Sequence, residues 1–241
     1  KAPGDVVIAT KWNPLLRRAS NIPKTIGVRL GNLAPFPIDL YQVHNPLSFS
    51  SVQSEMRAMA GLVQAGKIRG VGVSNYSRNQ MEKAHRELQK MGLPLVSNQV
   101  RYSLLDRRIE RKGVLDAARD LGISIIAYSP LAQGLLTGVF HVDPGLISLR
   151  PGFRKYMSSF KAKGLRKSRP VIEALRRIAP KYQATPAQVA LNWIIGHHGQ
   201  TVVAIPGASR AGQVGDFTAA MSFHLSDEDM AELEQVSTPF K

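Results

Sequence analysis

Short apolar runs alternate with amphipathic stretches along the whole chain. The runs are rich in Val, Ile and Leu, as expected for strands buried on both faces; they are Val6–Ala9, Ile38–Val43, Gly70–Val73, Leu95–Val100, Ser124–Tyr128 and Thr201–Ile205. The stretches between them have the helical period and include Val52–Ala65, Gln80–Met91, Gly113–Leu121 and Pro186–Ile195. This alternation predicts parallel strands with helices outside them.

Helix starts can be predicted from capping residues. Thr185 and Pro186 suit the N-cap and the first turn of a helix, and Ser226 suits the N-cap of a last helix that begins at Asp227. Pro170 is expected to open a helix over Val171–Ile178. Residues 134–169 separate the last two strands; we expect them to form a long basic loop over the strand carboxyl ends.

Two architectures fit parallel strands that alternate with helices. An open doubly wound sheet needs a Gly-rich phosphate turn after its first strand. Here the first run is followed by Lys11-Trp12-Asn13-Pro14 instead. We therefore predict an α/β fold of the (β/α)8 TIM-barrel type, of which this chain supplies about six β/α units in a single domain over residues 1–241.

Composition narrows the chemistry. The chain has no cysteine, which excludes disulfides, thiol catalysis and thiolate metal sites. Its histidines show no metal-ligand spacing; the adjacent His197 and His198 are flanked by glycines and suggest a loop, so no metal site is predicted. No apolar run approaches the ~18 residues of a membrane span.

The positive charge is concentrated in one stretch. The formal net charge is +15, and residues 150–181 carry eleven Lys or Arg against the single acid Glu173. Such a stretch can attract an acidic protein or another polyanion, or it can be a solvated loop and helix face. It lacks the interleaved aromatic residues and motifs of nucleic-acid-binding domains, so none is predicted.

Polar or special residues stand where each apolar run ends. They are Lys11, His44, Ser74 and Asn75, Asn98 and Gln99, Tyr128 to Pro130, and Pro206 to Arg210. In a TIM barrel the carboxyl ends of the strands carry the chemistry. Lys11 and His44 are a candidate acid/base pair, although either alone could be an ordinary solvated or hydrogen-bonded residue.

Several of these segments resemble one enzyme family. They are Ile8–Lys11, Asp39–Pro46, Gly72–Asn75, Asn98–Val100, Ala127–Leu131, Ala184–Leu191 and Ile205–Ala208. Over nearly its whole length the chain resembles an aldo-keto reductase, and Gly134–Gly138 is similar to the bacterial, plastid and potassium-channel-subunit branches. The resemblance implies reduction of an aldehyde or ketone by hydride from NADPH, with a tyrosine as proton donor. It also implies a location in the cytoplasm or the plastid stroma.

The resemblance implies a role for each matching residue. Lys11 and His44 match the groups that tune the tyrosine, because a nearby cation lowers the pKa of a phenol. The implied cofactor-binding residues are Ser74, Asn75 and Gln99 for the nicotinamide carboxamide, Tyr128 for ring stacking, Ser129, Leu131 and Gln133 for the pyrophosphate, Gly207, Ala208, Ser209 and Arg210 for the 2′-phosphate, and Gln213 for the adenine ribose. A guanidinium suits a 2′-phosphate, which favours NADP(H) over NADH. Phe217 stands where relatives carry an asparagine facing the adenine.

Part of the family pattern has no counterpart in this chain. The resemblance begins at the third strand of the family barrel, and the two preceding strand–helix units carry the proton-donating tyrosine and its partner aspartate. None of the six tyrosines matches that tyrosine. Two functions therefore stay open: an NADPH-dependent reductase in the complete parent protein, or a catalytically silent structural or regulatory subunit that docks through its basic surface.

Overall fold

The computed structural model describes residue 2 and residues 4–149 and 152–241. Arg150 and Pro151, at the start of the basic stretch, lie outside the described residues. The chain divides into two compact units where the sequence predicts one domain. Unit 1 comprises Lys1–Val100 and Lys112–Ile125, and unit 2 comprises Arg101–Arg111 and Ile126–Lys241.

Strands and helices alternate as the hydrophobic pattern predicts. The strands are β1 (Ala9–Trp12), β2 (Leu40–Val43), β3 (Gly70–Ser74), β4 (Leu95–Arg101), β5 (Ser124–Tyr128) and β6 (Val202–Ile205). The α-helices are α1 (Asn21–Leu33), α2 (Val52–Gln64), α3 (Arg78–Gln89), α4 (Arg108–Arg111), α5 (Val114–Asp120), α6 (Val139–Val142), α7 (Leu146–Leu149), α8 (Ala162–Ile178), α9 (Pro186–His197), α10 (Ala211–Thr218) and α11 (Asp227–Ser237). The strand order of the sheet follows the chain order from β1 to β6.

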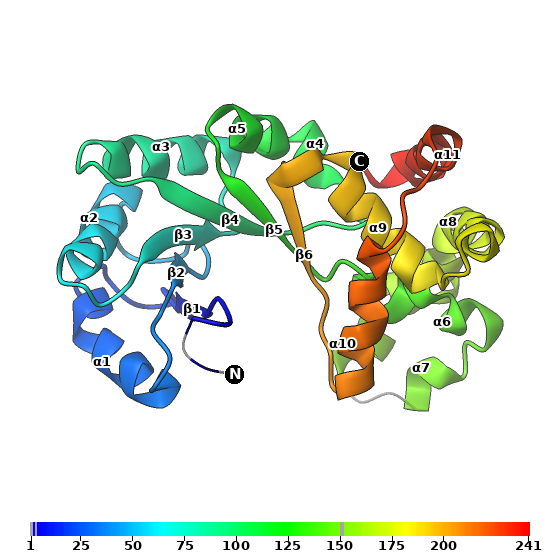
Figure 1. Ribbon diagram of the computed structural model, residues 1–241, viewed down its shortest axis with the longest axis horizontal. Coiled ribbons are helices and arrows are strands. Elements are labelled where there is room, and N and C mark those ends of the chain that lie inside the picture. The colour runs from blue at the N-terminus through cyan, green and yellow to red at the C-terminus, as the bar shows by residue number, and fades with distance from the viewer. Residues whose placement is uncertain (1, 3, 150–151) are drawn as a thin grey trace. The chain divides into compact units, whose positions relative to one another are not determined.

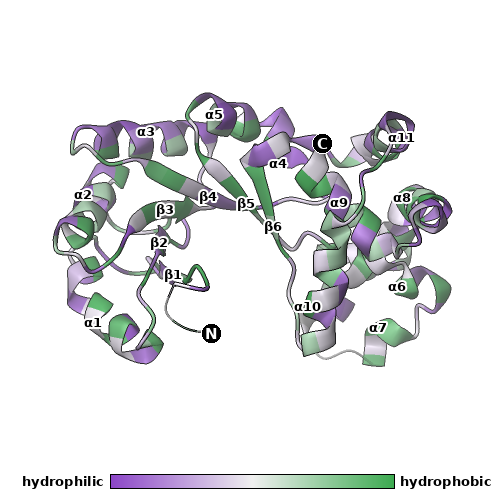
Figure 2. Ribbon diagram, viewed as in Figure 1, coloured by the Kyte–Doolittle hydropathy of each residue, from purple (hydrophilic) through white to green (hydrophobic). Residues whose placement is uncertain are grey.

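In unit 1 the strands β1 to β4 pair in parallel, each with the next. Helices α1, α2 and α3 lie side by side along this part of the sheet (Figure 1). Capping residues fix where two of these helices begin: the side chain of Ser51 accepts a hydrogen bond at the start of α2, and Ser77 and Gln80 form a capping box at the start of α3. In Figure 2, β4 changes from hydrophobic to hydrophilic toward its carboxyl end. Leu95 at the start of β4 thus belongs to the core, and the polar residues Ser97, Asn98 and Gln99 follow toward its carboxyl end.

Four residues on neighbouring strands of unit 1 are in register and point to the same face of the sheet. Lys11 is in register with Gln42, Gln42 with Gly72, and Gly72 with Ser97. Neighbours in register point to the same face of a sheet. A β-carbon at Gly72 would lie 2.5 Å from Ser97 Oγ and 2.9 Å from Gln42 Cγ, so only glycine fits between these side chains.

Unit 2 has a hydrophobic core of its own. Leu135, Phe140, Ile147, Phe160 and Leu165 form a buried cluster between the turn after β5 and the start of α8. Helix α9 begins at the predicted N-cap, because Thr185 and Gln188 form a capping box and Pro186 occupies the first turn. The last helix, α11, is capped by Ser226, also as predicted.

Other boundaries differ from the sequence-based prediction. Strand β1 starts at Ala9 rather than Val6, because the backbone N–H of Ile8 donates to the Asp39 carboxylate (2.8 Å) instead of entering the ladder. Helix α8 does not start at Pro170 but contains it: the buried positions Leu165, Ser168, Ile172 and Leu175 keep the helical period through the proline.

The segment 134–169 also differs from the long loop that its glycines and prolines suggested. It contains the short helices α6 and α7 and the first residues of α8. His197, expected in a loop, is the last residue of α9. Helix α1 had no counterpart among the predicted helices; its Ile22 and Ile26 are buried at helical spacing.

We expect Gly72→Ala to lower the free energy of unfolding by about 1–3 kcal/mol, the usual cost of overpacking a close-packed interior. Gly61→Ala is the matched control: Gly61 lies inside α2 with open space around its Cα. There the added methyl group should stabilise the protein by about 0.4–1 kcal/mol, because alanine favours the helix. Urea denaturation of both variants measures the difference, and equal effects of the two substitutions would contradict the close packing at Gly72.

Candidate functional site

Lys11 and His44 come together at the carboxyl ends of β1 and β2. The backbone N–H of His44 donates to the carbonyl of Trp12 (3.0 Å), which extends the β1–β2 pairing by one residue. The Lys11 side chain is half-buried, and burial lowers its pKa. Burial, followed by the positive charge of Lys11, lowers the pKa of His44. The two predicted residues are therefore electrostatic neighbours, and each is biased toward its neutral form.

Ser74, Asn75 and Gln99 form one hydrogen-bonded group. Ser74 Oγ and the backbone N–H of Asn75 both donate to the carbonyl of Gln99, at 2.8 and 2.9 Å. Asn75 Nδ2 donates to Ser74 Oγ (3.2 Å) and to the carbonyl of His44 (3.3 Å). Asn75 has a left-handed backbone (φ 61°), which asparagine tolerates better than most residues. Asn75 thus connects the predicted carboxamide-binding residues to the end of β2.

Gln42 supports this group, and the sequence reasoning did not single it out. Its Nε2 donates to Ser97 Oγ (3.1 Å), and its Oε1 accepts from Gln99 Nε2 (3.2 Å). Gln42 is fully buried, so its amide would be costly to leave unpaired. The only sequence signal for it is one polar residue within the apolar run of β2.

The two tyrosines of unit 1 do not take the role of a proton donor beside Lys11. Tyr41 neighbours Gln42 on β2, so its side chain points to the opposite face of the sheet, where the guanidinium of Arg29 lies 5.8 Å from its ring centroid. The hydroxyl of Tyr76 donates to the buried carboxylate of Glu55 (2.5 Å). Burial raises the pKa of both phenols, and Glu55 raises that of Tyr76 further.

Trp12, which ends β1, belongs to the core of unit 1. It is fully buried, and its Nε1 donates to Asn21 Oδ1 of α1 (2.9 Å). Phe49, in the segment after β2, is 67% exposed by contrast.

Six of the predicted cofactor residues line one cavity in unit 2. The cavity measures about 880 Å³ and includes Ser129, Leu131, Gln133, Gly207, Ser209 and Gln213 in its lining. Phe217 also lines it. Its volume lies in the range in which proteins bind small molecules and cofactors.

The turn after β5 has an unusual backbone. Ser129, Ala132 and Gln133 are non-glycine residues with φ of 52°, 47° and 57°, and Gly134 follows at 96°. Left-handed residues of this kind are strained and concentrate at ligand-binding sites, where consecutive N–H groups can form a concave anion site. Within the described residues this is the densest group of left-handed non-glycine residues.

The loop after β6 is organised by Gln213, which is on the first turns of α10. Gln213 Oε1 accepts from the N–H groups of Ser209 (2.8 Å) and Arg210 (3.1 Å), and from Ser209 Oγ (3.2 Å). Gly207, Ala208, Ser209 and Arg210 are all exposed, and Ala208 and Arg210 are not part of the cavity lining. The role of Gln213 in the structure is thus to hold the loop predicted to bind the 2′-phosphate.

Two features of the cavity were missed from the sequence. Arg154 lines it and donates from Nε to the carbonyl of Gln133 (3.1 Å), which brings a positive charge to the strained turn. The first turn of α9, from Thr185 to Gln188, also forms part of the wall. Arg154 belongs to the basic stretch, so the charge count was a signal for it, but no spacing rule assigned it to this cavity.

Tyr128, the predicted stacking residue, ends β5 and is half-buried. The guanidinium carbon of Arg101 lies 5.7 Å from its ring centroid, within the range of a cation–π contact. Across the described part of the chain, no helix has the length and apolar character needed to cross a membrane.

The sequence was compared with known protein families and individual proteins. It matches the profile described as aldo/keto reductase family over residues 1–238. An uncharacterized oxidoreductase of Mycobacterium bovis is 37% identical over 237 residues, which cover 98% of this chain and 70% of that protein. The chloroplastic pyridoxal reductase of Arabidopsis thaliana is 34% identical over 236 residues, which cover 95% of this chain and 62% of that protein.

Solved structures give the same result. The crystal structure of a thermostable aldo-keto reductase superimposes with a TM-score of 0.77 at 29% identity, over 96% of this chain and 72% of that one. The likeness confirms the α/β fold of the TIM-barrel type. The chain belongs to the aldo/keto reductase family of oxidoreductases.

Proposed function

We propose that the protein is an NADPH-dependent reductase of aldehydes or ketones. The observation that carries the proposal is the cavity in unit 2, whose lining contains six of the residues predicted to hold the cofactor. The donor set suits a dinucleotide: hydroxyls at Ser129 and Ser209, and the guanidinium of Arg154, are groups that bind phosphate oxygens. When bound, the cofactor supplies hydride to the carbonyl carbon of a substrate.

The residues of unit 1 suit the other half of this chemistry. Ser74, Asn75 and Gln99 provide the amide and hydroxyl groups that a carboxamide can pair with. Lys11 and His44 place hydrogen-bond donors at the carboxyl end of the sheet, where such donors favour the development of negative charge on a carbonyl oxygen. Burial and the positive charge of Lys11 lower the pKa of His44, which favours a neutral imidazole that can accept a proton.

Gln42 acts as a positioning residue in this proposal. Its amide fixes the side chain of Gln99, while Gly72 leaves the space that lets Gln42 reach Ser97. A site of this kind requires side chains that packing and hydrogen bonds hold in one orientation.

The second candidate function is a catalytically silent subunit. One observation favours it. Among the described residues of unit 1, neither tyrosine presents a free hydroxyl to Lys11: Tyr41 points to the opposite face of the sheet, and the hydroxyl of Tyr76 donates to Glu55. Docking would use the basic surface of residues 152–181, in which the Lys and Arg side chains other than Arg154 are exposed. For location we propose the cytoplasm or the plastid stroma; the Arabidopsis relative is named chloroplastic.

Lys11→Met should raise the pKa of His44. The positive charge of Lys11 disfavours the imidazolium, so its removal moves the pKa upward, while burial keeps it below the ordinary value. NMR titration of the His44 ring protons measures the shift. Lys24→Met, an exposed lysine of α1, is the matched control and should leave this pKa unchanged. An unchanged His44 pKa in Lys11→Met would contradict the pairing.

We expect NADPH to bind more tightly than NADH, and Arg210→Ala to reduce that preference by ~1–3 kcal/mol, the scale of a charge-assisted hydrogen bond. Arg111→Ala removes an equally exposed guanidinium from α4 and should not change the preference. Fluorescence titration of the unsubstituted protein and the two variants with both cofactors gives the six affinities. Equal binding of NADPH and NADH by the unsubstituted protein would refute the choice of cofactor.

A polypeptide limited to these 241 residues should reduce 4-nitrobenzaldehyde with NADPH only negligibly. A positioned general acid contributes ~10²–10⁴-fold to such a rate, and the phenols of unit 1 are held elsewhere. The comparison is with a full-length relative under the same conditions. A similar rate in both would mean that Tyr41, Tyr76 or Tyr102 donates the proton and that the strand assignment is incorrect.

A further inference from the structure

Unit 2 contains a second cavity, of about 630 Å³, to which no role has been assigned above. Four segments line it: residues 101–106 at and after the end of β4, the turn after β5, residues 157–168, and Phe240. Only Ser129 and Gln133 line both this cavity and the larger one. Its volume again suits a small molecule.

The wall of this cavity is apolar and continuous with the core of unit 2. Leu105, Leu135, Met157 and Phe240 contribute side chains to it. Leu135 is part of the buried cluster, and Leu105 and Met157 pack against that cluster. Gly164 closes one side of the cavity. A β-carbon there would overlap the carbonyl oxygens of Ser158 and Ser159, so the start of α8 lies directly against these two residues. The cavity is therefore formed by closely packed elements of unit 2.

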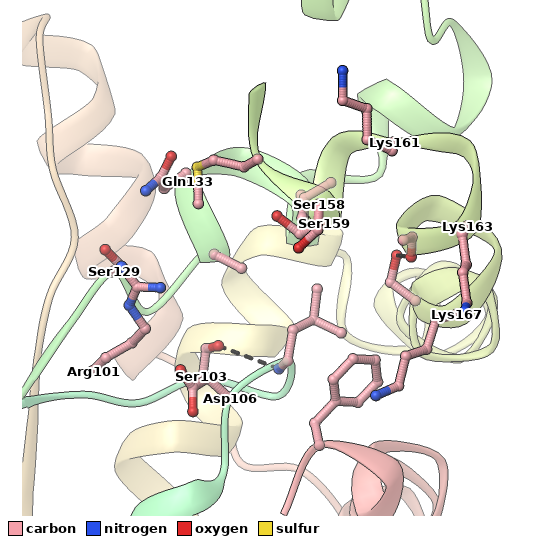
Figure 3. A pocket seen from close by; sticks show the side chains of 17 residues that line it. Arg101, Ser103, Asp106, Ser129, Gln133, Ser158, Ser159, Lys161, Lys163 and Lys167 are labelled. Carbon is pink, nitrogen blue, oxygen red and sulfur yellow. Dashed lines mark hydrogen bonds between the residues drawn. The ribbon is translucent and has the colours of Figure 1, made fainter. Parts of the chain in front are cut away.

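The charged residues around the cavity are almost all positive. Lys161, Lys163 and Lys167 lie on one side of it and Arg101 on the other (Figure 3). The lysines are exposed, which places their ammonium groups in contact with solvent at the rim. Lys167 Nζ lies 4.6 Å from the centroid of the Phe240 ring, where a cation and an apolar wall meet.

The one acid in the lining does not neutralise this rim. Both carboxylate oxygens of Asp106 are engaged by Arg108, at 2.8 and 2.7 Å. In addition, the first turn of α8, which carries Lys163 and borders the cavity, has no acidic residue and no side-chain cap. The helix start adds a partial positive charge to that of the lysines.

We propose that this cavity binds a small monoanionic amphiphile, of which a medium-chain carboxylate is the simplest example. Its apolar part would contact Leu105, Leu135 and Met157, and its anionic head would be at the rim with Lys163 and Lys167. A polyphosphate would leave the apolar wall hydrated, and a neutral hydrocarbon would gain nothing from the cations. The proposal does not rest on the reductase function.

Isothermal titration calorimetry of the full chain with octanoate tests the proposal, with 1-octanol as the uncharged probe of the same length. We expect saturable binding of one octanoate per chain, weakened by added salt because the rim is exposed to solvent. 1-Octanol should bind several-fold more weakly, since it lacks the charge. Absence of saturable octanoate binding, or equal affinities for the two probes, would overturn the proposal.

Paired variants locate the site. Lys163→Gln with Lys167→Gln should raise the octanoate Kd by about fivefold, the scale of two exposed, screened charges. Lys83→Gln with Lys112→Gln removes the same charge from exposed positions of unit 1 and should leave the Kd unchanged. If both double variants weaken binding equally, octanoate responds to net charge alone and the site is not the cavity.

A cavity-filling variant tests the apolar wall. Met157→Trp should block octanoate binding by occupying the cavity, whereas Met221→Trp, at a position that is 65% exposed, should not. Circular dichroism checks that each variant is folded, and the lysine variants decide the matter if Met157→Trp is not. Undiminished octanoate binding by folded Met157→Trp would overturn the proposal.

Discussion

The hydrogen bonds of the Gln42 side chain, which cross over Gly72 to Ser97 and Gln99, are the interaction on which the candidate site of unit 1 depends. An amide with no exposed surface is stable only when it is paired. By pairing with Gln99, it orients the residue whose carbonyl accepts from both Ser74 and Asn75. Asn75 in turn reaches the backbone of His44. One buried amide therefore connects most of the predicted polar residues of this unit.

In unit 2, the backbone conformation of a turn orients the functional groups, in place of a buried amide. The turn after β5 contains three left-handed non-glycine residues, each of which costs free energy that the surrounding packing must offset. The buried cluster of Leu135, Phe140 and Leu165 lies directly behind this turn. Gln213 orders the second loop of the cavity by accepting three hydrogen bonds from Ser209 and Arg210. Each unit thus orients its own functional groups through its own core.

The strand-end residues could be named from the sequence because each interrupts an apolar run with a polar group, and such interruptions are visible without a structure. Gln42 does not stand at the end of a strand. It lies within β2, and its role becomes visible only from the register, which pairs Gln42 with Gly72 and Gly72 with Ser97. The predicted start of β1 was too early, because the N–H of Ile8 donates to the carboxylate of Asp39, a residue distant in the sequence. Proline favours the first turn of a helix, which suggested a helix start at Pro170. The helical period of buried residues in α8 begins before Pro170 and continues through it.

The two cavities of unit 2 could not be predicted for a related reason. Their walls combine segments far apart in the chain, such as Arg154 with the turn after β5, or Phe240 with Lys167. Charge counting located the basic stretch but could not separate its solvated lysines from the arginine that faces a cavity. Such assignments need the packing of unit 2, which no local pattern specifies.

The central claim is that the larger cavity of unit 2 binds a nicotinamide dinucleotide. Backbone amide NMR spectra recorded during a titration with NADP⁺ test it most directly. The account predicts saturable shifts, with one common affinity, for Ser129, Gln133 and Ser209, which line that cavity. Spectra in which these amides stay unchanged at saturating NADP⁺, or in which only amides of the basic segment 152–181 shift, would contradict it.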